Sequence, residues 1–192
     1  GTEVINAACY PSQFGCTKDV PVYEFDVAKA KALMAEAGFP DGFKTEIYAY
    51  RDRAYLEPMI GYLSAIGIDT DLRFGQYSST RDALRGGKAP FAFMTWGSGS
   101  VPDADSSTPV FFGGGPDDLA MDEEVHKWLK EAGSTMDVEV RKAAYAKALK
   151  KIAAQSYWVP LFTWPTNYAM LKSLNWTPTE DEIPRFFTAS WK

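Results

Sequence analysis

Apolar residues follow a helical period in two stretches of the first half of the chain and a strand-like pattern in three others. Helical spacing runs through residues 27–37 and 56–66, which end at Gly38 and Gly67, and Asp26 is placed to cap the first stretch. Alternating or short continuous apolar runs occupy residues 43–49, 68–74 and 91–94. The pattern therefore predicts two amphipathic helices and three strands.

These elements alternate along the chain. A shorter helix, which Ser79 caps and Gly86 ends, separates the last two strands, so the order is strand, helix, strand, helix, strand. Helices of this length serve as crossovers between parallel strands. The sequence therefore predicts an α/β fold with a mainly parallel sheet flanked by helices. Ligands of such sheets bind beyond the carboxyl ends of the strands, where Arg51 and Trp96 follow the first and third strands.

The second half of the chain is predicted to be mainly helical. A helical turn is expected near residues 108–112, and Asp122 and Asp137 are placed to cap two amphipathic helices, the second reaching about residue 154. Basic residues on the longer helix are expected to face solvent: Arg141, Lys142, Lys147, Lys150 and Lys151. Further strands are expected over residues 157–164 and 168–171, before a proline-punctuated tail.

The stretch from Pro90 to Asp105 combines a short apolar strand with a flexible loop. The strand leads to Trp96, and the loop that follows is Gly97, Ser98, Gly99 and Ser100. A strand fixes the position of a large aromatic side chain, and glycines allow a ligand to approach the backbone closely. The stretch therefore predicts a binding surface. The alternative is that Trp96 is a core aromatic and that the loop is only a connector.

Length and charge limit the class of protein. The chain has 192 residues and a net charge of -5, which fits one globular domain with a substantial core and gives no basic footprint for nucleic acid. No apolar run approaches the roughly 20 residues that span a bilayer. Four of the six tryptophans follow residue 157, which suggests a tail that docks on another surface.

Two cysteines, Cys9 and Cys16, lie close together near the start of the chain. Either they form a disulfide, which would close a small loop and fit an oxidising compartment, or they are two free buried thiols. With one histidine and two cysteines the sequence offers no cluster of metal ligands, and it indicates no cofactor. The first residues lack the basic and apolar regions of a signal peptide, so we expect a processed chain or a fragment.

Little in the sequence indicates catalysis. The one histidine, His126, has no serine or cysteine beside it and is expected to be a solvated surface residue. Residues 97–100 lack the spacing of a nucleophile elbow and the ending of a phosphate loop. Acidic pairs fall in turn or helix-cap contexts, where acids favour helix dipoles: Asp117 with Asp118, and Glu123 with Glu124. We therefore expect that the protein is not an enzyme.

Several segments carry motifs that recur together in one family. Residues 26–43 are Asp-Val-Ala-Lys-Ala-Lys-Ala-Leu-Met-Ala-Glu-Ala-Gly-Phe-Pro-Asp-Gly-Phe. The others are Leu63-Ser-Ala-Ile-Gly-Ile68, Trp96-Gly97 with Pro102-Asp103, Asp137 with Arg141 and Tyr145 leading to Val159-Pro160-Leu161, and the end of the chain from Asp181 to Phe187 with Trp191-Lys192. Together they resemble the family 5 extracellular solute-binding proteins of ABC importers, which take up dipeptides, oligopeptides, nickel chelates and related solutes.

The resemblance implies a fold, partners and a location. The chain is similar to the C-terminal lobe of a two-lobed, periplasmic-binding-protein-like (type II) clamshell, which in the family traps a solute between its lobes. The implied partners are a small-molecule solute that is peptide-like and carries a carboxylate, the ABC transporter permease in the membrane, and the N-terminal lobe of the same protein, but no nucleic acid. The implied location is periplasmic, or extracellular and lipid-anchored in a Gram-positive source.

The resemblance also divides the chain into three expected segments. Residues 1–25 would be a hinge segment leading into the lobe, and residues 26–157 the C-terminal α/β lobe. Residues 158–192 would be an aromatic tail that returns toward the N-terminal lobe, which would explain the late tryptophans.

Ligand-binding residues follow from matching positions. The candidates are Trp96, Gly97, Ser98, Gly99, Ser100, Arg51 and Asp103. In peptide-binding members an aspartate after the matching Trp-Gly neutralises the α-amino group of the peptide; here that position is Gly99, with Asp103 as the fallback. Arg51 is the nearest match, and Arg53 the next, to an arginine that binds the α-carboxylate in dipeptide binders. The alternative for Arg51 is a solvated loop arginine.

The departure at Gly99 leaves other functions open. One is binding of a non-peptide solute such as an opine, a sugar or a metal chelate. Another is an interaction or assembly domain that docks through its aromatic tail.

Overall fold

The computed structural model describes residues 2–97, 101–179 and 183–192, and the chain forms two compact units. One unit comprises Gly1–Val22 and Trp96–Lys192, and the other comprises Tyr23–Thr95. The chain therefore passes into the second unit after Val22 and leaves it after Thr95, two residues beyond its last strand.

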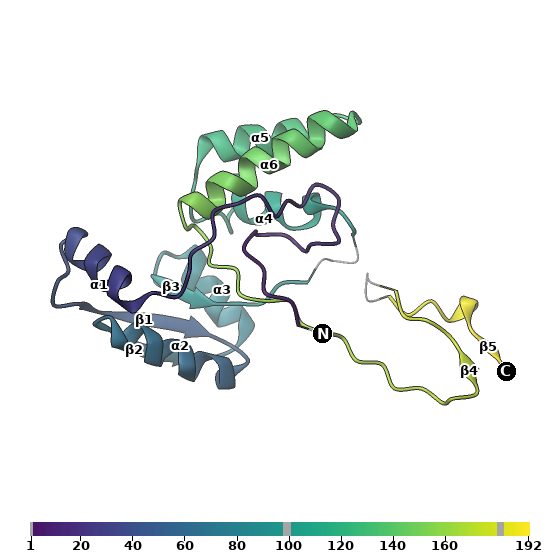
Figure 1. Ribbon diagram of the computed structural model, residues 1–192, viewed down its shortest axis with the longest axis horizontal. Helices are drawn as coiled ribbons and strands as arrows, with labels where there is room; N and C mark the ends of the chain where they lie inside the picture. Colours follow the sequence, from purple (N-terminus) through teal and green to yellow (C-terminus); the bar gives the residue numbers. More distant parts are fainter. Residues whose placement is uncertain (1, 98–100, 180–182) are drawn as a thin grey trace. The chain divides into compact units, whose positions relative to one another are not determined.

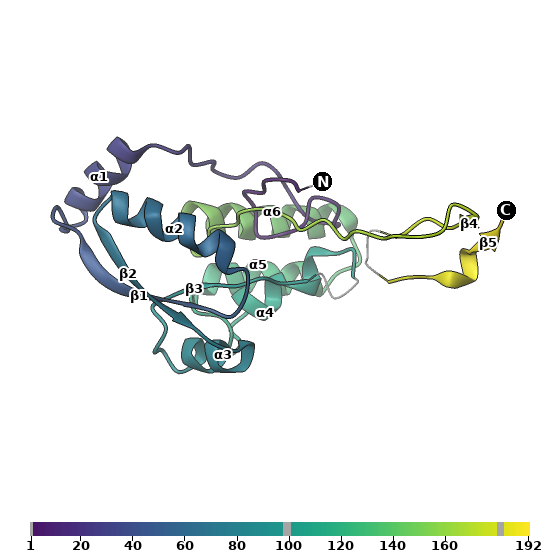
Figure 2. The ribbon, with the colours of Figure 1, turned by 90° about the horizontal axis from the view of Figure 1, so that it is seen from below.

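A three-stranded parallel sheet forms the centre of the second unit. The strands are β1 (Phe43–Ala49), β2 (Ile68–Phe74) and β3 (Phe91–Phe93), in the order β2-β1-β3. The crossovers are α2 (Arg53–Ala65) and α3 (Tyr77–Arg85), and α1 (Val27–Glu36) precedes the sheet. The crossover through α2 runs from β1 to β2, and the crossover through α3 runs in the opposite direction, from β2 past β1 to β3. Right-handed connections therefore place α2 and α3 on opposite faces of the sheet (Figure 2). The predicted α/β class and parallel sheet are confirmed.

The register brings the carboxyl ends of the strands to one edge of this sheet. Ala49 at the end of β1 pairs with Phe74 on one side and with Phe93 on the other. Just beyond the strands, the hydroxyl of Tyr50 is hydrogen-bonded to Thr95, with 2.9 Å between the two side-chain oxygens and 3.2 Å to the Thr95 carbonyl oxygen. The ends of β1 and β3 are therefore held together by side chains as well as by the backbone.

Local signals explain where the helices of this unit begin and end. Asp26 caps α1, as predicted, by accepting a hydrogen bond from the Lys29 amide at 2.9 Å. Gly38 follows that helix with φ +88°, a value that favours glycine. The predicted start of α3 is wrong, because Gln76 is the N-cap and Ser79 lies inside the first turn. There the Ser79 hydroxyl accepts a hydrogen bond from the Gln76 amide at 3.1 Å and stabilises the helix start from within.

The apolar pattern of the second unit is only partly buried. Ile47 and Ala49 are fully buried, which confirms the predicted alternation in the second half of β1, whereas Phe43 at its start is exposed. In contrast, Leu56 is the one fully buried residue of α2, and Leu33 on α1 is 53% exposed. The helical stripes of this unit therefore retain apolar surface that the described residues do not cover.

The first unit is built on helices. Its elements are a 3-10 turn η1 (Ala104–Ser106), α4 (Thr108–Phe112), α5 (Glu123–Gly133) and α6 (Val138–Ala154), and α5 and α6 lie side by side (Figure 1). Facing residues of the two long helices form most of the core: Val125, Leu129, Ala132, Ala144, Tyr145, Ala148, Leu149 and Ile152. The predicted helices and their caps at Asp122 and Asp137 are confirmed. No helix among the described residues is long and apolar enough to cross a membrane.

The last part of the chain differs from its prediction. Residues 157–164 and 168–171 were expected to form strands, but within the described residues the first stretch makes only a single β-bridge, between Val4 and Phe162. Pro160 and Pro165 lack the amide donors that a ladder needs, so an extended pairing does not form. A short antiparallel pair forms instead between β4 (Leu174–Asn175) and β5 (Ser190–Trp191), with a 3-10 turn η2 (Phe186–Thr188) between them.

An ion pair ties the start of α5 to the end of α6. The ammonium of Lys151 lies 2.8 Å from Asp122 Oδ2 and also contacts Glu124, and the Tyr157 hydroxyl donates to Asp122 Oδ2 at 2.7 Å. Lys151 was predicted to lie on a solvated face, but its side chain is only 25% exposed because these acceptors surround it. The prediction is therefore wrong for this lysine.

Several hydrogen bonds converge on the carboxylate of Asp122. Burial by itself would raise the pKa of Asp122, but the hydrogen bonds from Lys151, from Tyr157 and from the amides of Val125 and Glu124 outweigh it and lower the pKa to about 2. The folded-state pKa thus lies below the unfolded value of about 3.9. The stability that this group contributes is present above pH ~4 and is lost as the pH falls from about 4 to about 2.

We predict that Asp122→Asn lowers the unfolding free energy at pH 7 by about 1 kcal/mol, a value reduced by solvent screening. Asparagine keeps the helix cap but not the charge, so the variant also becomes less sensitive to acid between pH 4 and 2. Asp137→Asn is the matched control, because Asp137 caps α6 through the same kind of backbone hydrogen bonds. Urea unfolding from pH 7 to pH 2 measures both variants, and equal acid sensitivity of wild type and Asp122→Asn would contradict the prediction.

Candidate functional site

Trp96 is the first residue after the chain leaves the second unit, and its side chain joins an aromatic cluster. The Trp96 ring meets Phe111 edge-on, with 4.7 Å between centroids and 87° between planes. Phe111 in turn contacts Trp158 at 4.6 Å, and Phe112 contacts Trp158 at 5.0 Å. Phe112 is buried, whereas Trp96 is only partly buried. Trp96 therefore packs along one part of its ring and leaves the rest accessible.

Of the predicted Gly/Ser loop, Gly97 is described and exposed. A Cβ atom at Gly97 would meet no atom within 4 Å, so packing does not require glycine there. Ser98, Gly99 and Ser100 lie outside the described residues.

Arg51 follows β1 in the second unit, and its charged partner is Asp52, the next residue in the chain. Its Nε lies 2.7 Å from Asp52 Oδ2, within ion-pair distance, but the alignment does not make a hydrogen bond. The Arg51 side chain is 55% exposed, so much of it remains free to meet another anion. Asp52 itself sits in the left-handed region with φ +60°, and its Oδ2 is shielded from solvent without a hydrogen-bond partner.

Arg53, the other candidate match, lies on the surface of α2. It pairs with Glu57 one turn later, with 3.1 Å between Nε and Oε1, and both side chains are 64% exposed. This geometry is typical of a solvent-exposed helical ion pair.

Asp103 is held within the first unit by Arg141. Arg141 Nη2 donates to Asp103 Oδ2 at 2.9 Å, and both side chains are 21% exposed. The other oxygen of Asp103 accepts the Asp105 amide at 3.0 Å and caps η1. Both carboxylate oxygens of Asp103 are thus already engaged.

Arg141 has further partners that complete this network. Its guanidinium lies 4.7 Å from the centroid of the Phe14 ring, and its Nε donates to the Ala132 carbonyl at 3.1 Å. Its Nη2 also donates to the Tyr145 hydroxyl, which in turn donates to Asp105 at 3.0 Å; burial raises the pKa of Tyr145. The prediction that Arg141 faces solvent is wrong. The four-residue spacing from Arg141 to Tyr145 places both on one face of α6, so the sequence itself indicates that Arg141 lies beside a residue of the buried face.

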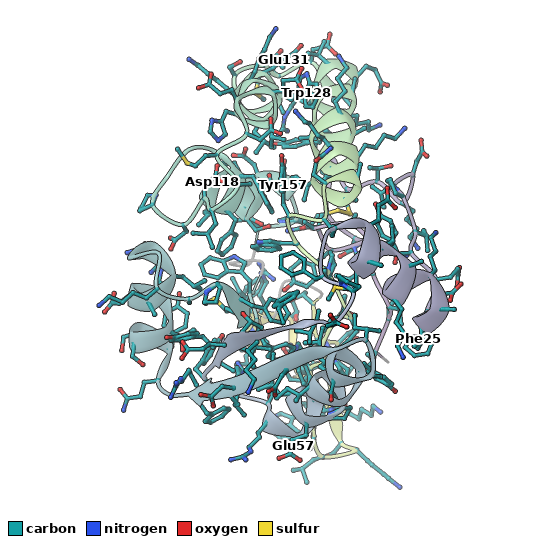
Figure 3. The ribbon with its side chains drawn as sticks, turned by 90° about the vertical axis from the view of Figure 1, so that its left-hand side faces the viewer. Phe25, Glu57, Asp118, Trp128, Glu131 and Tyr157 are labelled. Atoms are coloured by element: carbon teal, nitrogen blue, oxygen red, sulfur yellow. A yellow bond between two sulfur atoms is a disulfide. The ribbon has the colours of Figure 1, made fainter. Side chains whose placement is uncertain are left out.

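His126 is likewise not a simply solvated residue. Its Nε2 lies 2.7 Å from Asp118 Oδ2, and its side chain is 25% exposed. The Asp118 carboxylate is fully buried and also accepts hydrogen bonds from the amides of Gly114, Ala120 and Met121. Figure 3 shows Asp118 near Tyr157. His126 therefore anchors the loop before α5.

The remaining candidate groups are the possible metal ligands and the two cysteines. Within residues 2–97, 101–179 and 183–192, no three or more His, Cys, Asp or Glu side chains come together to hold a metal ion. Cys9 and Cys16 form a disulfide with 5.7 Å between their Cα atoms, and Cys9 is 5% exposed. The bridge belongs to the core of the first unit.

Comparison with known proteins identifies a related group. The family model described as "Bacterial extracellular solute-binding proteins, family 5 Middle" matches residues 1–119. A curated relative, "Heme-binding protein A" of Haemophilus influenzae, is 24% identical over 164 residues, which is 79% of this chain and 30% of that protein.

Solved structures share the fold. HbpA2 from Haemophilus parasuis superposes with a TM-score of 0.86 at 23% identity, over 100% of this chain and 40% of that one. The periplasmic binding protein DppA from Helicobacter pylori, solved in complex with the peptide STSA, has a TM-score of 0.76 at 24% identity, over 84% of this chain and 33% of that one. The chain thus spans less than half the length of these relatives.

We predict that Asp103→Ala lowers the unfolding free energy by about 2 kcal/mol, because it leaves the guanidinium of Arg141 partly buried without its carboxylate partner. Glu139→Ala, which removes an exposed ion pair from the same helix, is the control and costs about 0.5 kcal/mol or less. Urea unfolding distinguishes the two. An Asp103→Ala variant as stable as wild type, with weakened solute binding, would show instead that Asp103 contacts the solute.

Proposed function

Because the chain belongs to the family 5 bacterial extracellular solute-binding proteins, we propose that it is part of a receptor that binds a peptide or peptide-like solute through the carboxylate of that solute. The family supplies solutes to ABC importers and consists of binding proteins, not enzymes. The receptor would release its solute to a permease in the membrane.

The observation that carries this proposal is the position of Arg51. It lies two residues beyond the end of β1, the central strand of a parallel sheet, at the edge where such sheets bind ligands. A guanidinium offers two parallel N–H donors that match a carboxylate. Its present partner, Asp52, is the next residue in the chain and meets it without hydrogen-bond alignment. A solute carboxylate that accepts both donors would therefore replace a weaker contact.

Trp96 is proposed as a second, separate contact. Its ring packs edge-on against Phe111 and is only partly buried, which suits contact with an aliphatic or flat part of a solute. Gly97, which is exposed and unconstrained by packing, would let a solute approach the backbone. Asp103 is the less suitable partner for an amine, because Arg141 already occupies it.

A metal chelate is the second candidate solute. The Haemophilus influenzae relative is named for heme binding, and the structural similarity to HbpA2 extends over the whole chain. Heme also carries carboxylates, so Arg51 would serve either solute. The occupied state of Asp103 favours this candidate, because it removes one partner for a peptide amine.

A periplasmic or extracellular location is proposed from the same family relationship, and the Cys9–Cys16 disulfide fits an oxidising compartment. The tail after residue 157 exposes large side chains, including Phe187 at 84% and Trp191 at 71%. These support the proposal that residues 158–192 pack on a further lobe. Assembly through the tail is the alternative, which concentration-dependent sedimentation would reveal.

We predict that a panel of solutes added to the complete protein raises the melting temperature only for carboxylate-bearing members. The panel contains the tetrapeptide Ser-Thr-Ser-Ala, hemin, an opine and an uncharged sugar. At about 100 times its Kd, a ligand adds about 2.7 kcal/mol, which raises the melting temperature of the complete protein by roughly a few degrees Celsius. The peptide is expected to give the largest shift, whereas a shift with hemin alone would favour the chelate. Stabilisation by the sugar alone would contradict carboxylate recognition.

We predict that Arg51→Ala weakens binding of the stabilising panel member by about 10- to 100-fold, because the solute carboxylate loses a charged donor. Arg51→Lys should fall between wild type and Arg51→Ala, since lysine keeps the charge but not the planar fork. Arg53→Ala is the matched control two residues away, where an exposed pair with Glu57 is lost instead. Isothermal titration calorimetry measures all three. Weakening by Arg53→Ala but not by Arg51→Ala would overturn the assignment.

A further inference from the structure

The segment closed by the Cys9–Cys16 disulfide holds the chain at Trp96 and again a few residues later. The Tyr10 hydroxyl donates to the backbone carbonyl of Trp96. The Gln13 side-chain amide donates to the Val101 carbonyl at 3.3 Å, and the Phe14 amide donates to the Pro102 carbonyl at 2.9 Å. Tyr10, Gln13 and Phe14, all in the disulfide-closed segment, thus donate hydrogen bonds to the backbone carbonyls of Trp96, Val101 and Pro102.

The disulfide-closed segment is itself held together by several interactions. In addition to the disulfide, two hydrogen bonds join Gln13 to Tyr10. The side-chain oxygen of Gln13 accepts a hydrogen bond from the backbone amide of Tyr10 at 2.9 Å, and the backbone amide of Gln13 donates to the Tyr10 carbonyl at 2.9 Å. The Gln13 side chain is 5% exposed and donates a second hydrogen bond to the Ser106 hydroxyl at 2.8 Å. Both polar atoms of this buried side chain therefore have partners, and its removal deletes the hydrogen bonds to Val101 and Ser106.

The segment is also fixed to the core of its unit. Cys9 belongs to the buried cluster, and the ring of Phe14 lies under the guanidinium of Arg141. Gly15 has φ +80°, and a Cβ atom there would lie 2.4 Å from the ring of Tyr145, so the backbone passes directly against that core residue. These contacts hold the segment, and with it Tyr10 and Gln13, against the core of the unit.

We infer that Tyr10 and Gln13 are positioning residues for Trp96. The disulfide-closed segment fixes where the backbone of Trp96 lies, so it determines how the Trp96 ring is presented between Phe111 and a solute. The effect of this positioning on binding rests on the proposed function, in which Trp96 contacts the solute. The positioning of Trp96 by Tyr10 and Gln13 does not depend on that function.

The test is the ¹⁹F NMR spectrum of the complete protein labelled with 5-fluorotryptophan, with the Trp96 signal assigned by its loss in Trp96→Phe. Tyr10→Phe removes one hydroxyl and keeps the disulfide, and Gln13→Met keeps the volume but removes the amide donors. We expect both to shift or broaden the Trp96 signal and to leave the signals of Trp176 and Trp191 unchanged. The double variant Cys9→Ser with Cys16→Ser, which removes the disulfide, should also shift or broaden the Trp96 signal.

Tyr48→Phe is the matched control, because it removes a hydroxyl hydrogen bond to Glu46 in the second unit. It should leave the Trp96 signal where wild type has it. A Trp96 signal that is unchanged in both Tyr10→Phe and Gln13→Met would overturn the inference, whatever the protein binds.

Affinities for Ser-Thr-Ser-Ala and hemin separate this inference from the proposed function. If both hold, Tyr10→Phe weakens the probe that binds by about 2- to 10-fold, in line with the loss of one hydrogen bond that positions its contact. If the Trp96 signal moves but Trp96→Ala leaves both affinities unchanged, the positioning stands and the role of Trp96 as a solute contact fails.

Discussion

Arg141 joins three segments of the first unit that are far apart in the sequence. Its guanidinium bonds the carboxylate of Asp103 in the segment after Trp96, lies over Phe14 in the disulfide-closed segment, and contacts Tyr145 on its own helix. A partly buried charge is tolerated only when its donors are satisfied, so these partners constrain one another. The segment that returns from the parallel sheet is therefore fixed by a network that starts on α6.

This constraint explains why the candidate Asp103 and its neighbour Asp105 stabilise the structure. Asp103 and Asp105 follow the predicted binding loop, where a solute amine would need an acid, yet both are engaged by Arg141 or Tyr145. Asp118 is engaged in the same way by His126 and three backbone amides. These three acids stabilise loops, whereas the exposed arginine that follows β1 keeps its capacity for an anion.

The sequence predicted the regular elements well and the polar contacts poorly. Helix caps such as Asp122 and Asp137, and the alternation in β1, are local signals, and the structure follows them. The tail was misjudged because an apolar run does not reveal whether a pairing partner exists. Lys151 and Arg141 were assigned to solvent because their partners are distant in sequence. Tyr10 and Gln13 carried no motif, since their role depends on contacts that only the folded chain forms.

Native mass spectrometry of the complete protein, incubated with an equimolar mixture of peptides and hemin, tests the central claim most directly. The account predicts a single retained solute that carries a carboxylate and that is lost in Arg51→Ala. A solute that wild type and Arg51→Ala retain equally would contradict recognition of the carboxylate by the arginine that follows β1.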